Sequence, residues 1–165
     1  MILGMSIASF TAFHVALSLV GIASGFLVIV GMLGNKSLPG WTALFLLTTV
    51  ATSVTGFLFP STGIDPAQVV GIVSLVALAA ALIARYTYHL VGISRAAYIV
   101  TAVLAQWLNS FVAVVQSFQK IPIVHMLAPT QKEPPFLIAQ VGLMVLMVLL
   151  GVFAFRRFHP TSAAI

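Results

Sequence analysis

The chain contains no cysteine, and only 5% of its 165 residues are charged. The absence of cysteine excludes disulfides, thiol catalysis, cysteine-ligated zinc and iron–sulfur clusters. The scarcity of charge excludes a soluble domain, because a water-facing surface typically needs about a quarter of all residues to be charged. Only two residues are acidic, Asp65 and Glu133. The sequence therefore offers no paired carboxylates within an apolar stretch, which argues against a proton pump that works by an acid relay.

Apolar residues, in contrast, make up 61% of the chain, and the mean hydropathy is +1.19. A membrane-spanning helix needs about 20 mainly apolar residues. Five stretches have this character, at about 7–33, 41–59, 69–90, 96–118 and 136–155. Because the connections between most of them are short, sequential helices should lie antiparallel. The predicted fold class is all-α: residues 1–165 form one transmembrane domain, an up-and-down bundle of five spans. The first stretch lacks a basic segment before it and is expected to remain as a span.

The basic residues predict the orientation of this bundle. Five of the seven fall on one side of the predicted membrane: Lys36, Arg85, Arg95, Arg156 and Arg157. The remaining two, Lys120 and Lys132, fall on the other side together with both acidic residues. Since cytoplasmic loops carry an excess of lysine and arginine, the first side is predicted to be cytoplasmic. The N-terminus is then outside and the C-terminus inside.

Polar side chains at membrane depth are costly and therefore informative. The predicted outer half of the bundle collects one or more from every span: His14, Ser18, Ser53, Ser74, Gln106, Asn109 and Gln140. In one interpretation these groups bond to one another and hold the helices together. In the other they line a pocket for a small hydrophobic ligand, namely a quinone, a lipid or haem. Of the seven, only His14 carries an ionisable side chain.

The four histidines do not favour a metal centre. A b-type haem needs two histidines at matched depth, but His14 and His89 lie near opposite faces of the predicted membrane. His125 is on the same side as His14 but in a loop, so a shared haem would require that loop to fold into the mouth of the bundle. No zinc-type spacing is present. No metal site and no cofactor are predicted, and haem is kept as an alternative.

The longest connection, 119–135, reads KIPIVHMLAPTQKEPP over residues 120–135 and contains four of the eight prolines. So many prolines prevent one continuous helix. We expect the first half to lie at the outer interface and the prolines at 134–135 to begin the fifth span. The polar residues Lys120, His125, Lys132 and Glu133 are the candidates for contact with a partner, because loops on rigid scaffolds often carry function.

At the predicted inner face, the segments RYTYHLVGISR (85–95) and FRRFH (155–159) combine basic and aromatic residues. This pattern is typical of anchors at the headgroup level, with arginines extending toward anionic lipid. Small residues four apart, such as Gly21 with Gly25 and Ala77 with Ala81, indicate close helix contacts. We expect these contacts to lie within the chain rather than between two copies.

Three segments, TTVATSVTGFLFP (48–60), LNSFVAVVQSFQKIP (108–122) and LAPTQKEPPFLIAQ (127–140), resemble a family of small uncharacterised bacterial inner-membrane proteins. The resemblance covers nearly the whole chain, and APTQKEPPF is its most distinctive element. It implies a multi-span protein of the bacterial cytoplasmic membrane. It implies no activity and no site residue.

The sequence has no phosphate-binding loop and no Ser/His/acid set, so no catalytic residue is assigned and a non-enzymatic role is favoured. The excess of basic over acidic residues is explained by basic side chains at the membrane surfaces, and no nucleic-acid binding is predicted. The predicted function is an accessory or structural membrane subunit, in contact with the bilayer and with a membrane-protein partner or its own copies. The alternative is a protein that binds a small hydrophobic ligand in the outer polar pocket.

Overall fold

The computed structural model describes residues 1–60, 63 and 65–160. The long helices are α1 (Ile7–Leu33), α2 (Pro39–Gly56), α3 (Pro66–Leu82), α4 (Ile93–Lys120) and α6 (Pro134–Arg157). A short π-helix, η1 (Ile83–Thr87), continues α3, and a single turn, α5 (Pro122–His125), follows α4. The described part of the chain contains no β-strand beyond an isolated bridge between Ile2 and Met5. The all-α prediction is confirmed, and the long helices begin and end within a few residues of the predicted limits.

Local sequence signals explain where the helices begin. Proline occupies the first turn of α2, α3, α5 and α6, where its missing N–H costs nothing because the first turn has no intrahelical acceptor. In α3 this proline follows Asp65, whose carboxylate accepts a hydrogen bond from the Gln68 N–H at 2.8 Å in a capping box. The prolines at 134–135 begin α6, as predicted.

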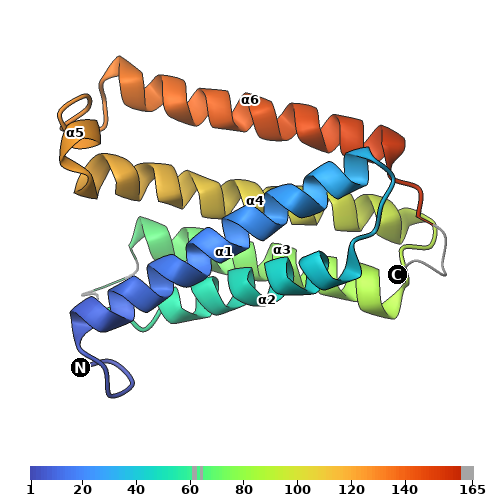
Figure 1. The fold of residues 1–165 in the computed structure, drawn as a ribbon, viewed down its shortest axis with the longest axis horizontal. Coiled ribbons are helices and arrows are strands. Elements are labelled where there is room, and N and C mark those ends of the chain that lie inside the picture. The colour runs from blue at the N-terminus through green and yellow to red at the C-terminus, as the bar shows by residue number, and fades with distance from the viewer. Residues whose placement is uncertain (61–62, 64, 161–165) are drawn as a thin grey trace.

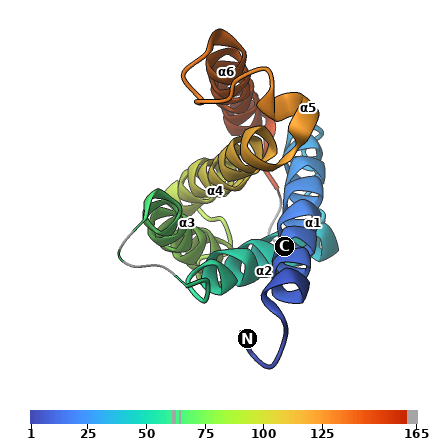
Figure 2. The ribbon, with the colours of Figure 1, turned by 90° about the vertical axis from the view of Figure 1, so that its left-hand side faces the viewer.

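The five long helices alternate in direction along the chain, but only four of them form the bundle (Figure 1). Viewed from one end, α1, α2, α3 and α4 make a ring, with contacts between each pair of neighbours (Figure 2). Helix α6 lies outside this ring, against α4 and part of α1. The expected compact bundle of five helices is therefore a ring of four with one peripheral helix.

Membrane character is evident in four helices of the described chain, which are long and apolar enough to cross a bilayer: α1, α3 with η1, α4 and α6. Helix α2 is not among them, since six of its 18 residues are threonine or serine. Among these four helices, α4 is the most buried and α6 the least buried. In the most apolar 18-residue window of α4 50% is buried, whereas in α6 only 6% is buried. Helix α4 is thus the central element, and α6 has few fully buried residues and many apolar side chains that are about half exposed.

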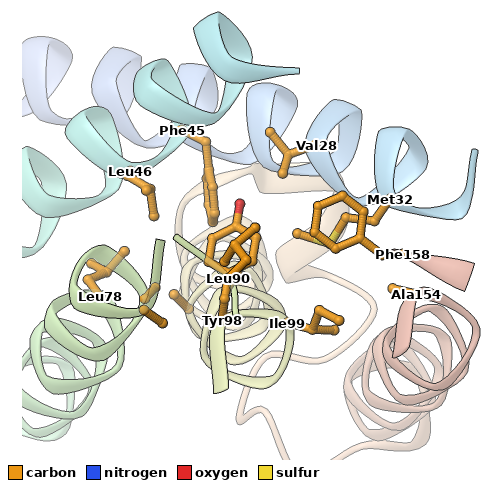
Figure 3. Close-up of a cluster of buried hydrophobic side chains, with 14 residues drawn as sticks. Val28, Met32, Phe45, Leu46, Leu78, Leu90, Tyr98, Ile99, Ala154 and Phe158 are labelled. Atoms are coloured by element: carbon orange, nitrogen blue, oxygen red, sulfur yellow. The ribbon is translucent and has the colours of Figure 1, made fainter. Parts of the chain in front are cut away.

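The hydrophobic core fills the end of the ring where α1 ends and α4 begins (Figure 3). Tyr98, Phe45 and Met32 are each at most 1% exposed there. Phe158, just beyond α6, is also 1% exposed, and its ring centroid lies 6.3 Å from that of Tyr98. The expectation that FRRFH only anchors the chain at the membrane surface is wrong for Phe158, because the segment after α6 crosses the end of the ring and inserts this side chain.

Candidate functional site

A seam of polar groups runs along the contact of α1 with α2 and α4. Gly21 and Gly25 are both buried in it, as expected for an internal contact. A Cβ at Gly21 would lie 3.0 Å from Thr49 Oγ1 and 3.2 Å from Asn109 Nδ2. A Cβ at Gly25 would overlap the Gln106 side chain. A Cβ at Gly25 would therefore force its neighbours to shift, and a Cβ at Gly21 would make unusually tight contacts, because polar side chains of α2 and α4 lie directly against the α1 backbone.

Most of the predicted pocket residues bond to one another or to nearby backbone. Ser18 Oγ donates to Asn109 Oδ1 at 2.9 Å, which joins α1 to α4. The Gln106 side chain, 0% exposed, donates from Nε2 to the Ile22 carbonyl at 3.0 Å. Interhelical hydrogen bonds of this kind stabilise bundles in lipid by about 0.6 kcal/mol each on average. The α1–α4 contact thus uses these side chains as links.

His14 is half-buried and pairs with α2. Its Nδ1 lies 2.9 Å from Thr55 Oγ1, and its ring packs edge-on against Phe59 at 5.2 Å between centroids. Thr55 Oγ1 also donates to the Ala51 carbonyl at 2.7 Å. Since a hydroxyl has one proton to donate, we infer that His14 donates from Nδ1 and keeps the lone pair on Nε2.

The remaining predicted pocket residues lie apart from this seam. Ser53 Oγ donates to Ser74 Oγ at 3.3 Å and links α2 to α3. Gln140 Nε2 donates to the Phe111 carbonyl at 3.3 Å and links α6 to α4. The seven side chains therefore do not converge on one point. They form links between four different pairs of helices.

Some buried polar atoms of the seam have no hydrogen-bond partner within the described chain. They are Thr49 Oγ1, Thr52 Oγ1 and Gln106 Oε1. A buried polar atom without a partner costs about 1–3 kcal/mol, so these atoms mark where water or a polar ligand group would be favoured.

The loop of residues 119–135, expected on the outer side, is folded on itself. The Glu133 carboxylate accepts hydrogen bonds from Thr130 Oγ1 at 2.8 Å and from the Thr130 and Lys132 N–H groups at 3.2 and 3.1 Å. Slight desolvation acts to raise the pKa of Glu133, but these hydrogen bonds outweigh it and hold the pKa below its ordinary value. His125 Nδ1 lies 2.9 Å from the Phe118 carbonyl at the end of α4. Lys120 and Lys132 are exposed at the same end of the molecule.

Arg85 differs from its sequence interpretation. The expected headgroup anchor is only 1% exposed, because the π-helical turn of η1 places its side chain inside the ring. Its Nη2 donates to Ser37 Oγ at 3.2 Å, and its guanidinium lies 5.7 and 5.6 Å from the ring centroids of Tyr86 and Tyr98. Nε and Nη1 have no partner in the described chain. The aromatic rings are the main stabilisation of this buried charge.

Arg95, also expected to extend toward lipid, makes its contacts within the protein at the end of α6. Its Nη1 donates to the Phe155 and Phe158 carbonyls at 2.9 and 2.8 Å, and its guanidinium lies 5.1 Å from the Phe155 ring centroid. A cation at a helix C-terminus compensates the partial negative charge of the terminal carbonyls. Arg95 therefore ties the peripheral helix to the start of α4.

An apolar groove of about 540 Å³ lies between α4 and α6. It falls within the usual size range of small-molecule sites. Its walls are apolar except at one end, where Arg156 lines it. The lining residues are Ile99, Val100, Val103, Leu104 and Trp107 of α4, and Met144, Met147, Val148, Gly151, Val152, Phe155 and Arg156 of α6.

The two walls meet at a small residue. A Cβ at Gly151 would lie 3.4 Å from Val103 Cγ1, so the missing side chain lets α6 approach α4 while the larger side chains on either side leave space. Trp107 Nε1 is buried and has no hydrogen-bond partner among the residues described.

Comparison with protein-family models, with curated proteins and with solved structures found no match for this chain. Within the described residues, no three His, Asp or Glu side chains gather in a way that would hold a metal ion. The seam, the outer loop and the groove are therefore interpreted from their own geometry.

Neither the groove nor the burial of Arg85 could be predicted from the sequence. Helix α6 is apolar on every face, so its sequence gives no periodic signal for the side that meets α4. Arg85 was placed by its position at a helix end, and a π-helical turn has no pattern that sequence periodicity would reveal.

Proposed function

We propose that this protein is a non-catalytic accessory subunit of a bacterial cytoplasmic membrane, and that it holds a hydrophobic membrane component against the α4–α6 groove. The observation that carries this proposal is the peripheral position of α6. Only 6% of its most apolar window is buried, and it forms an open apolar groove with α4. The polar groups of the interior, in contrast, are largely engaged in links between helices.

The proposal includes five spans. Helix α2 packs between α1 and α3, both of which are long and apolar enough to span, and this position supports α2 as a span at the same depth. Its threonines lower the cost of immersion by bonding carbonyls of their own helix. Thr48 Oγ1 donates to the Leu44 carbonyl at 2.7 Å, and Thr55 Oγ1 donates to that of Ala51 at 2.7 Å.

The proposal also includes an N-terminus outside and a C-terminus in the cytoplasm. Alternation of the helices brings Lys36, Arg85, Arg95, Arg156 and Arg157 to one end of the molecule. Both acidic side chains precede helices that start at the opposite end. This asymmetry favours the five-cation end as the cytoplasmic one.

Photocrosslinking in native membranes tests the proposed role of the groove. Benzoylphenylalanine is introduced at Val148, which lines the groove and is 58% exposed. The matched control is Val76 on α3, which is 66% exposed and outside the groove. We expect one defined adduct, protein or lipid, from position 148 and a mixture of bulk lipids from position 76. The same mixture of adducts from both positions would reject the groove as a binding surface.

A second candidate function is binding of a small ligand in the outer polar seam. It is supported by the unpartnered Gln106 Oε1 and Thr49 Oγ1 and by the Nε2 lone pair of His14. The test is an absorption scan, oxidised and reduced, of protein purified in mild detergent, together with extraction of co-purifying quinone. Loss of such a chromophore in a folded His14→Ala variant would support this function over the first. A spectrum without any chromophore would remove haem and quinone from consideration.

A further inference from the structure

The groove between α4 and α6 occupies only half of the depth of the two helices. Its lining residues run from Arg156 to Met144 on α6, a distance of about 18 Å at 1.5 Å per residue. In the other half the helices are closed against each other, by the hydrogen bond from Gln140 to the Phe111 carbonyl and by the Phe118 and Phe136 rings at 5.3 Å. One leaflet of a bilayer is about 15 Å thick, half of a hydrocarbon core of about 30 Å. The groove therefore matches one leaflet, whereas a docked transmembrane helix would need the full thickness.

The charge at the end of the groove distinguishes between kinds of lipid. Arg156 is exposed, lines the groove at the membrane edge, and is the only charged residue among the described residues that line it. The Arg95 guanidinium lies over the ring of Phe155, which also lines the groove. The two acidic side chains of the chain, Asp65 and Glu133, lie at the opposite end of the molecule and cannot pair with Arg156. The open end of an acyl-chain groove is thus marked by an arginine that has no carboxylate side chain near it.

We propose that the groove binds an anionic phospholipid of the leaflet at the C-terminal end of α6. One acyl chain lies between α4 and α6 down to Trp107 and Met144, and Arg156 binds the phosphate through its guanidinium. Flexible methionine side chains in the wall suit an occupant with many conformations. This inference rests on the proposed function, since it names the hydrophobic component that the groove holds.

Trp107 provides an internal reporter for the experiment. The chain has two tryptophans, and replacing the exposed one by Trp41→Phe leaves Trp107 as the only tryptophan, which can be excited selectively beyond the absorption of the three tyrosines. The protein is reconstituted in phosphatidylcholine vesicles that contain a fixed small fraction of either brominated phosphatidylglycerol or brominated phosphatidylcholine. Bromine near the end of the acyl chain quenches a tryptophan that it contacts. We expect the relative association of the anionic lipid to be about fivefold higher, from the attraction that one arginine exerts near a membrane surface.

Two neighbouring arginines separate a site from general surface charge. In Arg156→Gln the fivefold preference should disappear. Arg157 is the next residue and does not line the groove. Arg157→Gln removes the same charge, and most of the preference should remain in this variant. Val100→Phe should also lower quenching by both lipids, because position 100 lines the groove and is 59% exposed, so the larger side chain fills space without entering the core.

Several results would overturn the inference. Equal quenching by the two lipids would show that the groove does not recognise the headgroup. An equal loss of the preference for the anionic lipid in Arg156→Gln and Arg157→Gln would show that the preference comes from general surface charge. A protein adduct at position 148 without any lipid preference would place another chain in the groove. In each of these cases a defined adduct at position 148 would still support the proposed function, namely that the groove holds a hydrophobic membrane component. Failure of the phospholipid inference can therefore be distinguished from failure of the proposed function.

Discussion

Substituting Gly25 by alanine tests the tight contact between α1 and α4 on which the ring depends. The added Cβ would overlap the Gln106 carboxamide and lie 2.8 Å from Phe45 Cδ2. Relief requires the Gln106 side chain to move, and its 3.0 Å hydrogen bond to the Ile22 carbonyl would then be lost. Both partners are buried, and Gln106 itself is 0% exposed, so neither can move into free space.

The magnitude follows from three terms. Inserting a methyl group into a packed interior costs about 1–3 kcal/mol. Losing the Gln106 hydrogen bond costs about 1 kcal/mol more. Replacing glycine by alanine within a helix stabilises the helix by about 1 kcal/mol, because alanine has the higher helix propensity. The free energy of unfolding should therefore fall by about 1–3 kcal/mol in Gly25→Ala, measured by denaturant titration in detergent micelles.

Gly142→Ala is the matched control. Gly142 lies in α6, and a Cβ there would meet no atom within 4 Å. The same substitution should leave stability unchanged or raise it by up to about 1 kcal/mol. Equal effects of the two substitutions would contradict the α1–α4 contact. The double variant Gly25→Ala/Gln106→Ala provides a second check, since deleting the carboxamide should make the two changes less costly together than their sum.

Two further predictions concern the polar links. Asn109→Ala should lower the free energy of unfolding by about 1 kcal/mol, because it removes the 2.9 Å hydrogen bond from Ser18, whereas Ser117→Ala should change it little, because that hydroxyl bonds a carbonyl of its own helix. Equal effects would show that the interhelical link adds no stability. Glu133 stabilises the folded loop fully above pH 4.5, its ordinary pKa, and this contribution is lost as the pH falls through the lower pKa of the folded state. The protection factor of the Thr130 amide, which compares its hydrogen exchange with that of an unstructured peptide at the same pH, should therefore fall below pH 4.5 in the wild type and be low at all pH values in Glu133→Gln.

The sequence alone sufficed to predict the helices. Their limits depend on local chemistry, such as proline in the first turn of α6 and the Asp65–Gln68 capping box of α3. Their membrane character depends on composition, which needs no knowledge of packing. The sequence also located the polar side chains correctly on their helices, and the small pair Gly21 and Gly25 correctly predicted an internal contact.

The pairing of those side chains was decided by the tertiary structure. Ser18 and Asn109 are 91 residues apart in the chain, and His14 and Thr55 are 41 apart. Sequence periodicity indicates the face of a helix on which a residue lies, but not the rotation of two helices about their axes relative to each other. From the sequence, the seven side chains were expected to gather in one cluster, either as links between helices or as a ligand pocket, whereas the structure contains separate links. Whether the seam also binds a ligand stays a prediction.

The end of the molecule that carries five basic residues shows the same division most clearly. Composition alone predicts that Arg85, Arg95 and Arg156 lie near one membrane edge, because charges are excluded from hydrocarbon. Only the fold decided that Arg85 points into the ring, that Arg95 binds the last carbonyls of α6, and that Arg156 stands at the open end of a groove. The physical reason is that lipid favours apolar side chains equally on every face of α6. The position of α6 outside the ring therefore depends on how its side chains fit those of α4, at contacts such as Gly151 with Val103. The pattern of hydrophobic residues along the chain does not encode this position.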